Sequence, residues 1–345
     1  MKSAITYISL ITGMLATLSS CEHKDLCFNH DEHAPKSTIR IDAEYEQEWQ
    51  YTIEGAVEWK TYPGWESSFG MSYDVLRPDI PDGLRVQVYH TDGTNTIMNI
   101  APEGDIVRIR PGEHSLLFYN NDTEYIVFDN MQSYSKARAT TRTRSRSSYI
   151  GNSYMKNRNE NTVNAPDMLY GNYMESYTAE RKTETDVLPV TMHPLVFTYL
   201  VRYEFSHGLE YVALARGALA GMAEAVWLNS GRTSEETVTV LYDCTLQDFG
   251  AEALVYSFGV PDYPNGQYTT RAERSYALNL EVRLKNGKIL SFDFDVTDQV
   301  ATQPRGGVLI VSGIEISDED GMEGGSGFDV TINDWGEYED VDIIF

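Results

Sequence analysis

Short segments in which apolar and polar residues alternate recur along the chain, and this pattern constrains the fold most strongly. Two clear examples are Ser37–Tyr45 and Leu84–His90. A period of two residues is typical of β-strands with one buried and one solvent-facing side. Turn signals separate many such segments, among them Asp92-Gly93, Pro111-Gly112 and Asn286-Gly287. The sequence therefore predicts an all-β fold in which short strands form packed sheets.

The remaining strand candidates fall into two groups, and a length of 345 residues suits two domains. The candidates are 94–100, 106–110, 112–119, 125–128, 187–192, 196–205, 237–242, 253–258, 276–284, 289–296 and 308–316. We expect β-sandwich domains at residues 37–130 and 166–345. Residues 211–228 are ambiguous between a short helix and a strand with a glycine turn, since they contain Gly217-Ala-Leu-Ala-Gly221.

Acidic residues outnumber basic ones by 52 to 27, which gives a formal net charge of −25. This charge excludes a protein that binds the phosphate backbone of nucleic acids over a broad surface, so no nucleic-acid partner is expected. The exception is the basic segment, residues 131–165, which is rich in Ser, Thr and Arg. We interpret it as a linker or a long exposed loop. The alternatives are an anionic-ligand patch and a protease-sensitive site.

The N-terminus has the features of an export signal. Lys2 precedes a mostly apolar run, residues 4–18, which ends in Leu18-Ser-Ser-Cys21. This ending resembles the lipobox of bacterial lipoproteins, in which the peptidase cuts before a cysteine that becomes acylated. The resemblance implies a signal peptide at residues 1–20, lipid attachment at Cys21 and a tether at residues 21–36. The alternative is an ordinary secretory signal whose cysteine is incidental.

Two groups of residues are candidate metal sites, but for each group an explanation without a metal is better supported. The tether places His23, Cys27, His30 and His33 within eleven residues, but nothing in a flexible leader orients them. Asp293, Asp295 and Asp298 are explained by strand alternation better than by a calcium loop. We therefore expect no metal and no cofactor. Besides the acylated residue, we expect Cys27 and Cys244 to be free thiols.

The sequence contains no motif that indicates catalysis. It lacks a lipase-type nucleophile elbow, a zinc-protease helix motif and a phosphate-binding loop. His193 and His207 lie on β-rich segments, where single histidines are more often structural. We therefore expect a protein that is not an enzyme.

An ordered set of segments resembles a family of fimbrillin-like surface lipoproteins from anaerobic gut and oral bacteria. The segments are Leu18-Ser-Ser-Cys21, Pro81-Asp-Gly-Leu-Arg-Val86, Tyr119-Asn-Asn-Asp-Thr-Glu124, Gly217-Ala-Leu-Ala-Gly-Met-Ala223, Asp295-Val-Thr-Asp-Gln299, and Asn333-Asp-Trp followed by Asp342-Ile-Ile. The resemblance implies two tandem transthyretin-like β-sandwiches and, in type V pili, assembly by donor-strand exchange. It also implies candidate processing positions, which are Arg40, Arg138, Arg142, Arg144 and Arg146. The strand-like C-terminus, 328–332 and 341–345, is either a donor strand or part of its own sheet.

The resemblance predicts a surface-exposed outer-membrane lipoprotein that acts as a fimbrial anchoring or accessory subunit, or as an adhesion component. Its partners would be the outer membrane, fimbrial subunits and a host or glycan ligand. The alternative is a carbohydrate-binding surface lipoprotein. That alternative rests on the early aromatic group Trp49, Trp59, Tyr62 and Trp65, whose rings could stack on sugars.

Overall fold

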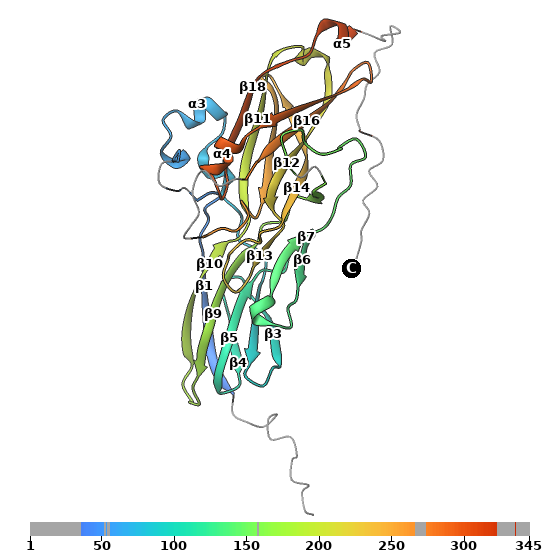
Figure 1. Cartoon of the computed structure of the whole chain (residues 1–345). Coiled ribbons are helices and arrows are strands. Elements are labelled where there is room, and N and C mark those ends of the chain that lie inside the picture. The colour runs from blue at the N-terminus through green and yellow to red at the C-terminus, as the bar shows by residue number, and fades with distance from the viewer. Residues whose placement is uncertain are drawn as a thin grey trace, which may run out of the picture.

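The computed structural model describes residues 36–322 except 52, 54, 55, 157, 158 and 266–273, together with Trp335. The described chain forms two β-sandwiches placed end to end (Figure 1), which confirms the expected all-β fold. The strands are β1 (Ser37–Tyr45), β2 (Leu84–His90), β3 (Asn95–Ile100), β4 (Ile106–Ile109), β5 (Gly112–Tyr119), β6 (Ile126–Asp129), β7 (Arg138–Thr141), β8 (Asn161–Asn164), β9 (Tyr170–Ala179), β10 (Asp186–Pro194), β11 (Phe197–His207), β12 (Val212–Ala223), β13 (Ala225–Trp227), β14 (Thr237–Gln247), β15 (Gly250–Ser257), β16 (Ala277–Leu284), β17 (Ile289–Asp295) and β18 (Gly307–Glu315). The helices are η1 (Trp59–Thr61), α3 (Trp65–Phe69), η2 (Tyr73–Leu76), η3 (Tyr134–Lys136), η4 (Leu209–Tyr211), α4 (Thr297–Ala301) and α5 (Asp318–Met322).

The first sandwich is one seven-stranded sheet that folds back on itself. The strand order is β3-β2-β5-β9-β10-β1-β4, and β9 pairs with β10 through His193↔Gly171 and Pro194↔Tyr170. Residues from both halves of the sheet, including Ile39, Val86 and Phe118, share one buried apolar cluster. The alternating residues of β1, β2 and β5 thus fill the space between two layers, as their period of two predicts.

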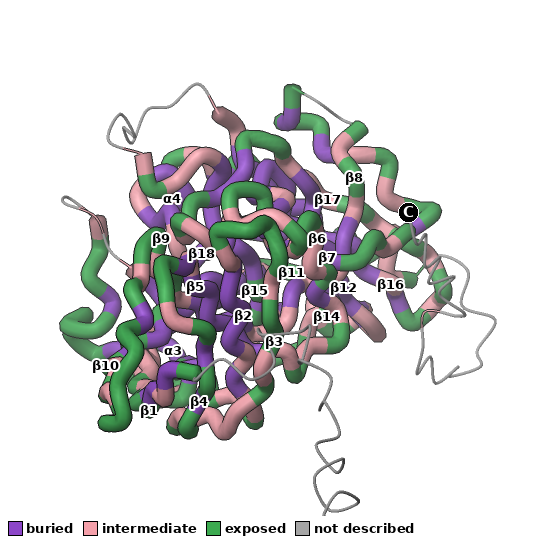
Figure 2. The backbone as a smooth tube through the Cα atoms, turned by 90° about the horizontal axis from the view of Figure 1, so that it is seen from below, coloured by how far each residue is buried: buried purple, intermediate pink, exposed green. Residues whose placement is uncertain are grey.

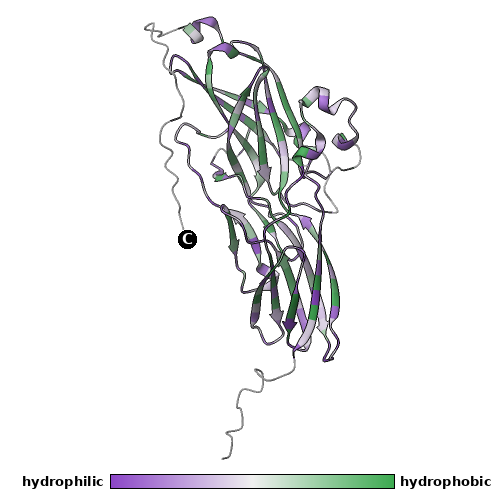
Figure 3. Ribbon diagram, turned by 180° about the vertical axis from the view of Figure 1, so that it is seen from behind, coloured by the Kyte–Doolittle hydropathy of each residue, from purple (hydrophilic) through white to green (hydrophobic). Residues whose placement is uncertain are grey.

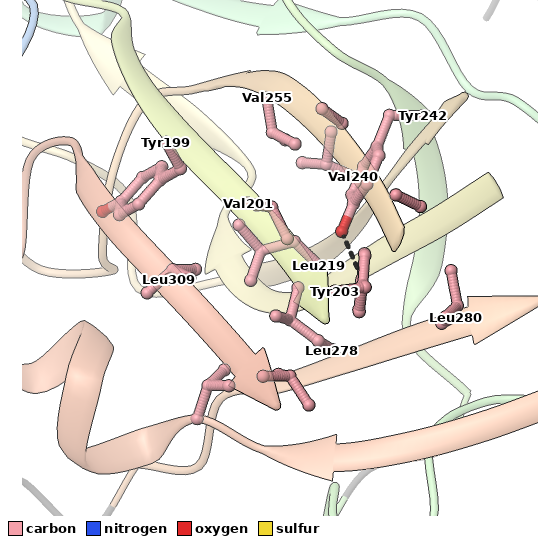
Figure 4. Packing of buried hydrophobic residues seen from close by; sticks show 14 of the residues in the cluster. Tyr199, Val201, Tyr203, Leu219, Val240, Tyr242, Val255, Leu278, Leu280 and Leu309 are labelled. Atoms are coloured by element: carbon pink, nitrogen blue, oxygen red, sulfur yellow. Dashed lines mark hydrogen bonds between the residues drawn. The ribbon is translucent and has the colours of Figure 1, made fainter. Parts of the chain in front are cut away.

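The second sandwich is built in the same way from β17-β16-β12-β14-β15-β11-β18, with β8 beside β14. Its core is the largest in the protein's described part and draws on β11, β12, β14, β15, β16 and β18. Figure 4 shows Tyr203 and Tyr242 reaching toward each other inside this core, where their hydroxyls lie 2.8 Å apart. The hydrogen bond satisfies two polar groups that would otherwise be costly to bury.

A three-stranded sheet, β13-β7-β6, lies at the junction of the two sandwiches. Its apolar cluster combines Leu117 of the first sandwich, Ala139 of β7, and Val226 and Phe258 of the second half of the chain. The expected domain boundaries therefore do not coincide with the sheets. β9 and β10 follow residue 165 but belong to the first sandwich, because the chain returns to that sheet after crossing the junction.

The ambiguous stretch 211–228 is mainly a strand, β12, and it is buried on both faces. Leu219 points into the core, whereas Arg216 and Ala218 point to the opposite face and are also buried. That opposite face is covered by residues 142–156, here called the cover segment. Met155 of this segment packs on Ala220 and Ala277. A strand buried on both sides loses its alternation, which explains why the sequence pattern did not identify it.

Part of the basic segment is thus not the exposed loop that composition indicated. β7 belongs to the junction sheet, and Asn152 of the cover segment donates to the Leu278 carbonyl over 2.8 Å.

Figure 2 shows buried residues concentrated along the strands and exposed residues around the periphery. Figure 3 shows apolar and polar residues intermixed along many strands. No helix of the described part is long and apolar enough to span a membrane.

Candidate functional site

The first described strand, β1, is an inner strand of the first sandwich and directly follows the predicted tether. It pairs in parallel with β10 from Ile39↔Asp186 to Tyr45↔Met192, and antiparallel with β4 from Ser37↔Ile109 to Arg40↔Ile106. Ile39 and Ile41 are buried in the core between the layers. A force applied at the start of β1 would therefore act along a strand that is hydrogen-bonded on both sides.

The five candidate processing arginines lie in different environments. Arg40 and Arg142 are exposed, whereas Arg138 contacts Asp129 at 3.0 Å and Arg144 contacts Asp243 at 3.3 Å. Arg146 is only 8% exposed, and its guanidinium donates to the Gly217 carbonyl and to Asn279 Oδ1. A protease must bind the arginine side chain in its own pocket, so the buried Arg146 is a poor substrate in the folded chain.

The three early tryptophans form a core and not an open platform, whereas Tyr62 is 40% exposed. Trp49, Trp59 and Trp65 are buried against Leu200 of β11 and Val308 of β18, on the outer face of the second sandwich. Trp59 and Trp65 belong to residues 56–77, here called the aromatic segment, which packs on this face (Figure 1, beside α3). Tyr51, which precedes this segment, makes an isolated bridge with Arg305. Sugar stacking on the three tryptophans is therefore blocked by their own packing.

Arg202 of β11 fastens the aromatic segment to the second sandwich. Its Nε donates to Glu252 Oε2 over 2.5 Å, and its two terminal nitrogens donate to the carbonyls of Ser68 and Phe69 over 2.6 and 2.8 Å. The guanidinium also lies over the rings of Phe69 and Phe249, at 4.7 and 4.5 Å from their centroids. These contacts tie a segment that leaves the first sandwich after β1 to the second sandwich.

The free edge of β18 is closed by two glutamine side chains. Gln303 Oε1 accepts from the Val308 N–H over 2.7 Å, and its Nε2 donates to the Val308 carbonyl over 3.0 Å. Gln299, one helical turn earlier, makes the same two bonds to Ile310, over 2.9 and 3.0 Å. The side-chain amides take the place of a neighbouring strand, so the part of this edge at Val308 and Ile310 is not open to another chain. Sequence reasoning missed this pair, for which the only signal is a Gln-x-x-x-Gln spacing before a strand.

A cleft of about 490 Å³ lies where the two sandwiches meet. Its walls include Tyr51, His193 and Arg305. Tyr51 donates to Glu46 Oε2 over 2.5 Å, and His193 Nδ1 lies 2.9 Å from the same oxygen. Burial and the bond to Glu46 raise the pKa of Tyr51. Burial opposes ionisation of Glu46, but the bonds from Tyr51 and His193 outweigh it and lower its pKa.

Several predicted features lie outside the described residues. These are Cys21, the tether with His23, Cys27, His30 and His33, and the C-terminal strands 328–332 and 341–345. Cys244 is a free thiol whose pKa is raised by burial. Asp293 accepts from Asn279 and from the Ser153 N–H, which accounts for it structurally. In the described part, no three His, Cys, Asp or Glu side chains converge on one point.

Comparison with known proteins gives a consistent result. Residues 74–243 match a family described as a domain of unknown function, DUF5119. The chain is 27% identical over 173 residues to Fim4B of Bacteroides ovatus, which is named as a fimbrium anchoring subunit. That alignment covers 50% of this chain and 50% of Fim4B, so the chain matches about half the length of its curated relative.

One solved structure shares the architecture. A protein of Bacteroides ovatus described as an adhesin is 20% identical, covers 88% of this chain and 95% of its own, and superposes with a TM-score of 0.58. A second adhesin-type protein of that species is 8% identical and has a TM-score of 0.46, over 83% of this chain and 91% of its own. The chain is thus similar in sequence to a fimbrium anchoring subunit over half of its length, and it shares the fold of the first adhesin structure.

Proposed function

We propose that this chain is an outer-membrane lipoprotein that anchors a fimbrium or forms an accessory part of it. Acylation at Cys21 would hold the chain in the membrane, because each buried methylene contributes about 0.8 kcal/mol and several acyl chains act together. The similarity to a fimbrium anchoring subunit over 173 residues is the observation that carries the proposal. The role requires binding and mechanical strength and no catalytic step.

The position of β1 supports an anchoring role. The predicted lipid attachment site is 16 residues before the start of β1, which spans Ser37–Tyr45. Tension between the membrane and a fimbrium would enter the fold through β1 and load its hydrogen bonds to β10 and β4 together, in shear. Cleavage after Arg40 would cut this strand and separate the tether from the fold. We therefore propose that the working subunit keeps Arg40 uncleaved.

The covered outer faces suit transmission of that force. The aromatic segment and the cover segment each pack on one outer face of the second sandwich, and the junction sheet shares a core with both sandwiches. The junction sheet thus joins the two sandwiches, and the two segments add contacts on the second sandwich. Partner binding by strand exchange would need an edge other than the first half of β18, because Gln299 and Gln303 already occupy the bonding positions of Val308 and Ile310.

The test compares wild type with Cys21→Ala and Cys27→Ala in the source bacterium. Cys27→Ala is the matched control, because it removes a second cysteine from the same tether. We expect wild type and Cys27→Ala to incorporate labelled fatty acid, to pellet with outer membrane and to cross-link to fimbrial subunits. Cys21→Ala should be unlabelled and leave the membrane fraction. Equal labelling of Cys21→Ala, or no fimbrial subunit among the cross-linked products of wild type, would contradict the proposal.

A further inference from the structure

Two histidines of the first sandwich face each other across neighbouring strands. His90 at the end of β2 and His114 in β5 are direct partners in the antiparallel ladder. Their Nδ1 atoms lie 3.1 Å apart, and their rings are nearly perpendicular, at 86°, with centroids 4.9 Å apart. His114 is buried, and His90 is half-buried. Both side chains line a cleft of about 520 Å³ on the surface.

The outer ring nitrogens determine where the protons sit. His114 Nε2 lies 2.7 Å from the Arg110 carbonyl oxygen, which can only accept, so this nitrogen carries the hydrogen. Neutral His114 therefore presents a lone pair at Nδ1. His90 Nε2 lies 2.9 Å from Thr96 Oγ1, and a hydroxyl can donate or accept. Without a metal, His90 donates from Nδ1 to His114 Nδ1 and accepts from Thr96.

We propose that His90 and His114 form a binding site for a divalent transition metal such as Zn²⁺, Ni²⁺ or Cu²⁺. Binding moves the His90 proton from Nδ1 to Nε2 through solvent, where it is donated to Thr96. Both Nδ1 lone pairs then coordinate the metal. Two ligands at about 2.0–2.1 Å from a tetrahedral ion lie about 3.3 Å apart, close to the spacing already present. No covalent bond of the protein breaks, and the net charge of the side chains is unchanged.

The surroundings provide the orienting contacts that metal-binding histidines usually have. The Arg110 carbonyl fixes the ring and tautomer of His114, and Thr96 can do the same for His90 once its proton has moved. The described residues supply no third His, Cys, Asp or Glu at coordination distance. The remaining coordination positions of the metal face the cleft, whose walls include Glu113 and Glu175. Water occupies these positions. The site is open, with exchangeable ligands.

The test must remove the competing donors of the tether. The starting protein is the full mature chain with His23, His30 and His33 changed to Gln and Cys27 changed to Ala, and ZnCl₂ and NiCl₂ are titrated by calorimetry. We expect one metal per chain, and at least tenfold weaker binding in His90→Gln and in His114→Gln. His193→Gln is the matched control and should bind as the starting protein does, because His193 lies at the cleft between the sandwiches. No binding by the starting protein, or unchanged binding in both variants, would overturn the proposal.

A second measurement does not depend on whether the variants fold. Cu²⁺ bound to the starting protein should give an electron paramagnetic resonance spectrum with coupling to two imidazole nitrogens. The circular dichroism of each variant should match the starting protein, so that a lost site is separated from a lost fold. A copper spectrum with coupling to no imidazole nitrogen would refute the site, whatever the variants do.

Discussion

Replacing Arg202 with alanine removes the side chain that holds the aromatic segment against the second sandwich. The variant leaves the Glu252 carboxylate without its cation, and the carbonyls of Ser68 and Phe69 without their donors. The side chains of Arg202 and Glu252 are only 8% and 12% exposed, so water replaces these partners poorly. Removing one member of a buried ion pair costs about 3–5 kcal/mol, because the other charge stays buried and unpaired.

The expected loss is therefore about 3–5 kcal/mol in the free energy of unfolding. Since 1 kcal/mol shifts the Tm of a large domain by about 2–4 °C, we expect Tm to fall by about 10 °C. The aromatic segment should also become sensitive to proteolysis before the sandwiches unfold, because Arg202 contacts it directly. Urea unfolding and timed trypsin digestion followed by mass spectrometry measure the two effects.

Lys60→Ala is the matched control for Arg202→Ala. Lys60 lies in the same aromatic segment and pairs with Glu48 at 2.7 Å, but the two side chains are 50% and 32% exposed. Such a surface pair contributes less than about 1 kcal/mol. If Arg202→Ala unfolds within about 1 kcal/mol of wild type, or if Lys60→Ala is equally destabilised, the reasoning that Arg202 holds the aromatic segment to the second sandwich is refuted.

Three further outcomes follow from other contacts. Gln303→Ala should expose the bonding groups of edge strand β18 and promote self-association, which sedimentation detects as a concentration-dependent rise in mass; a strictly monomeric variant would contradict this. Gly217→Ala should lower the free energy of unfolding in urea by about 1–3 kcal/mol, because the added Cβ would lie 2.2 Å from a buried tyrosine ring. Gly83→Ala is the control: its Cβ would meet no atom nearer than 3.9 Å, so the free energy of unfolding should change little. The hydrogen bond to Asp318 raises the pKa of His207, so this contact is stronger below that raised pKa, where His207 is charged, and weaker above it. An NMR titration should show a lower pKa for His207 in Asp318→Asn than in wild type. Equal pKa values in the two proteins would refute the pairing.

Local patterns were sufficient to predict strands that are buried on one face. The expected strand at Leu84–His90 has the observed bounds, and Asn286-Gly287 lies in the turn between β16 and β17, with Gly287 at φ +88°. A positive φ is the reason that glycine marks such turns. These features depend on nearest neighbours in the chain, which the sequence displays directly.

Features that depend on distant contacts were not predictable in this way. β12 is hidden on both faces by the core and the cover segment, so it has no alternation. The pairing of β1 with β10 joins residues far apart in the chain, and no local pattern indicates it. The sequence around Arg146 indicates a solvated segment, yet its two terminal nitrogens donate to Gly217 and Asn279 inside the fold. The two histidines of the proposed metal site come together only because β2 and β5 pair in one register.

We propose that this chain holds fimbriae at the cell surface, and the release of fimbriae from cells is the decisive measurement. Cells that lack the chain are complemented with wild type, Cys21→Ala or Cys27→Ala, and fimbriae are quantified on washed cells and in the medium by electron microscopy and immunoblotting. We expect wild type and Cys27→Ala to keep fimbriae on the cells, whereas Cys21→Ala should release them into the medium. Fimbriae that stay equally cell-bound with Cys21→Ala, or without the chain, would contradict it.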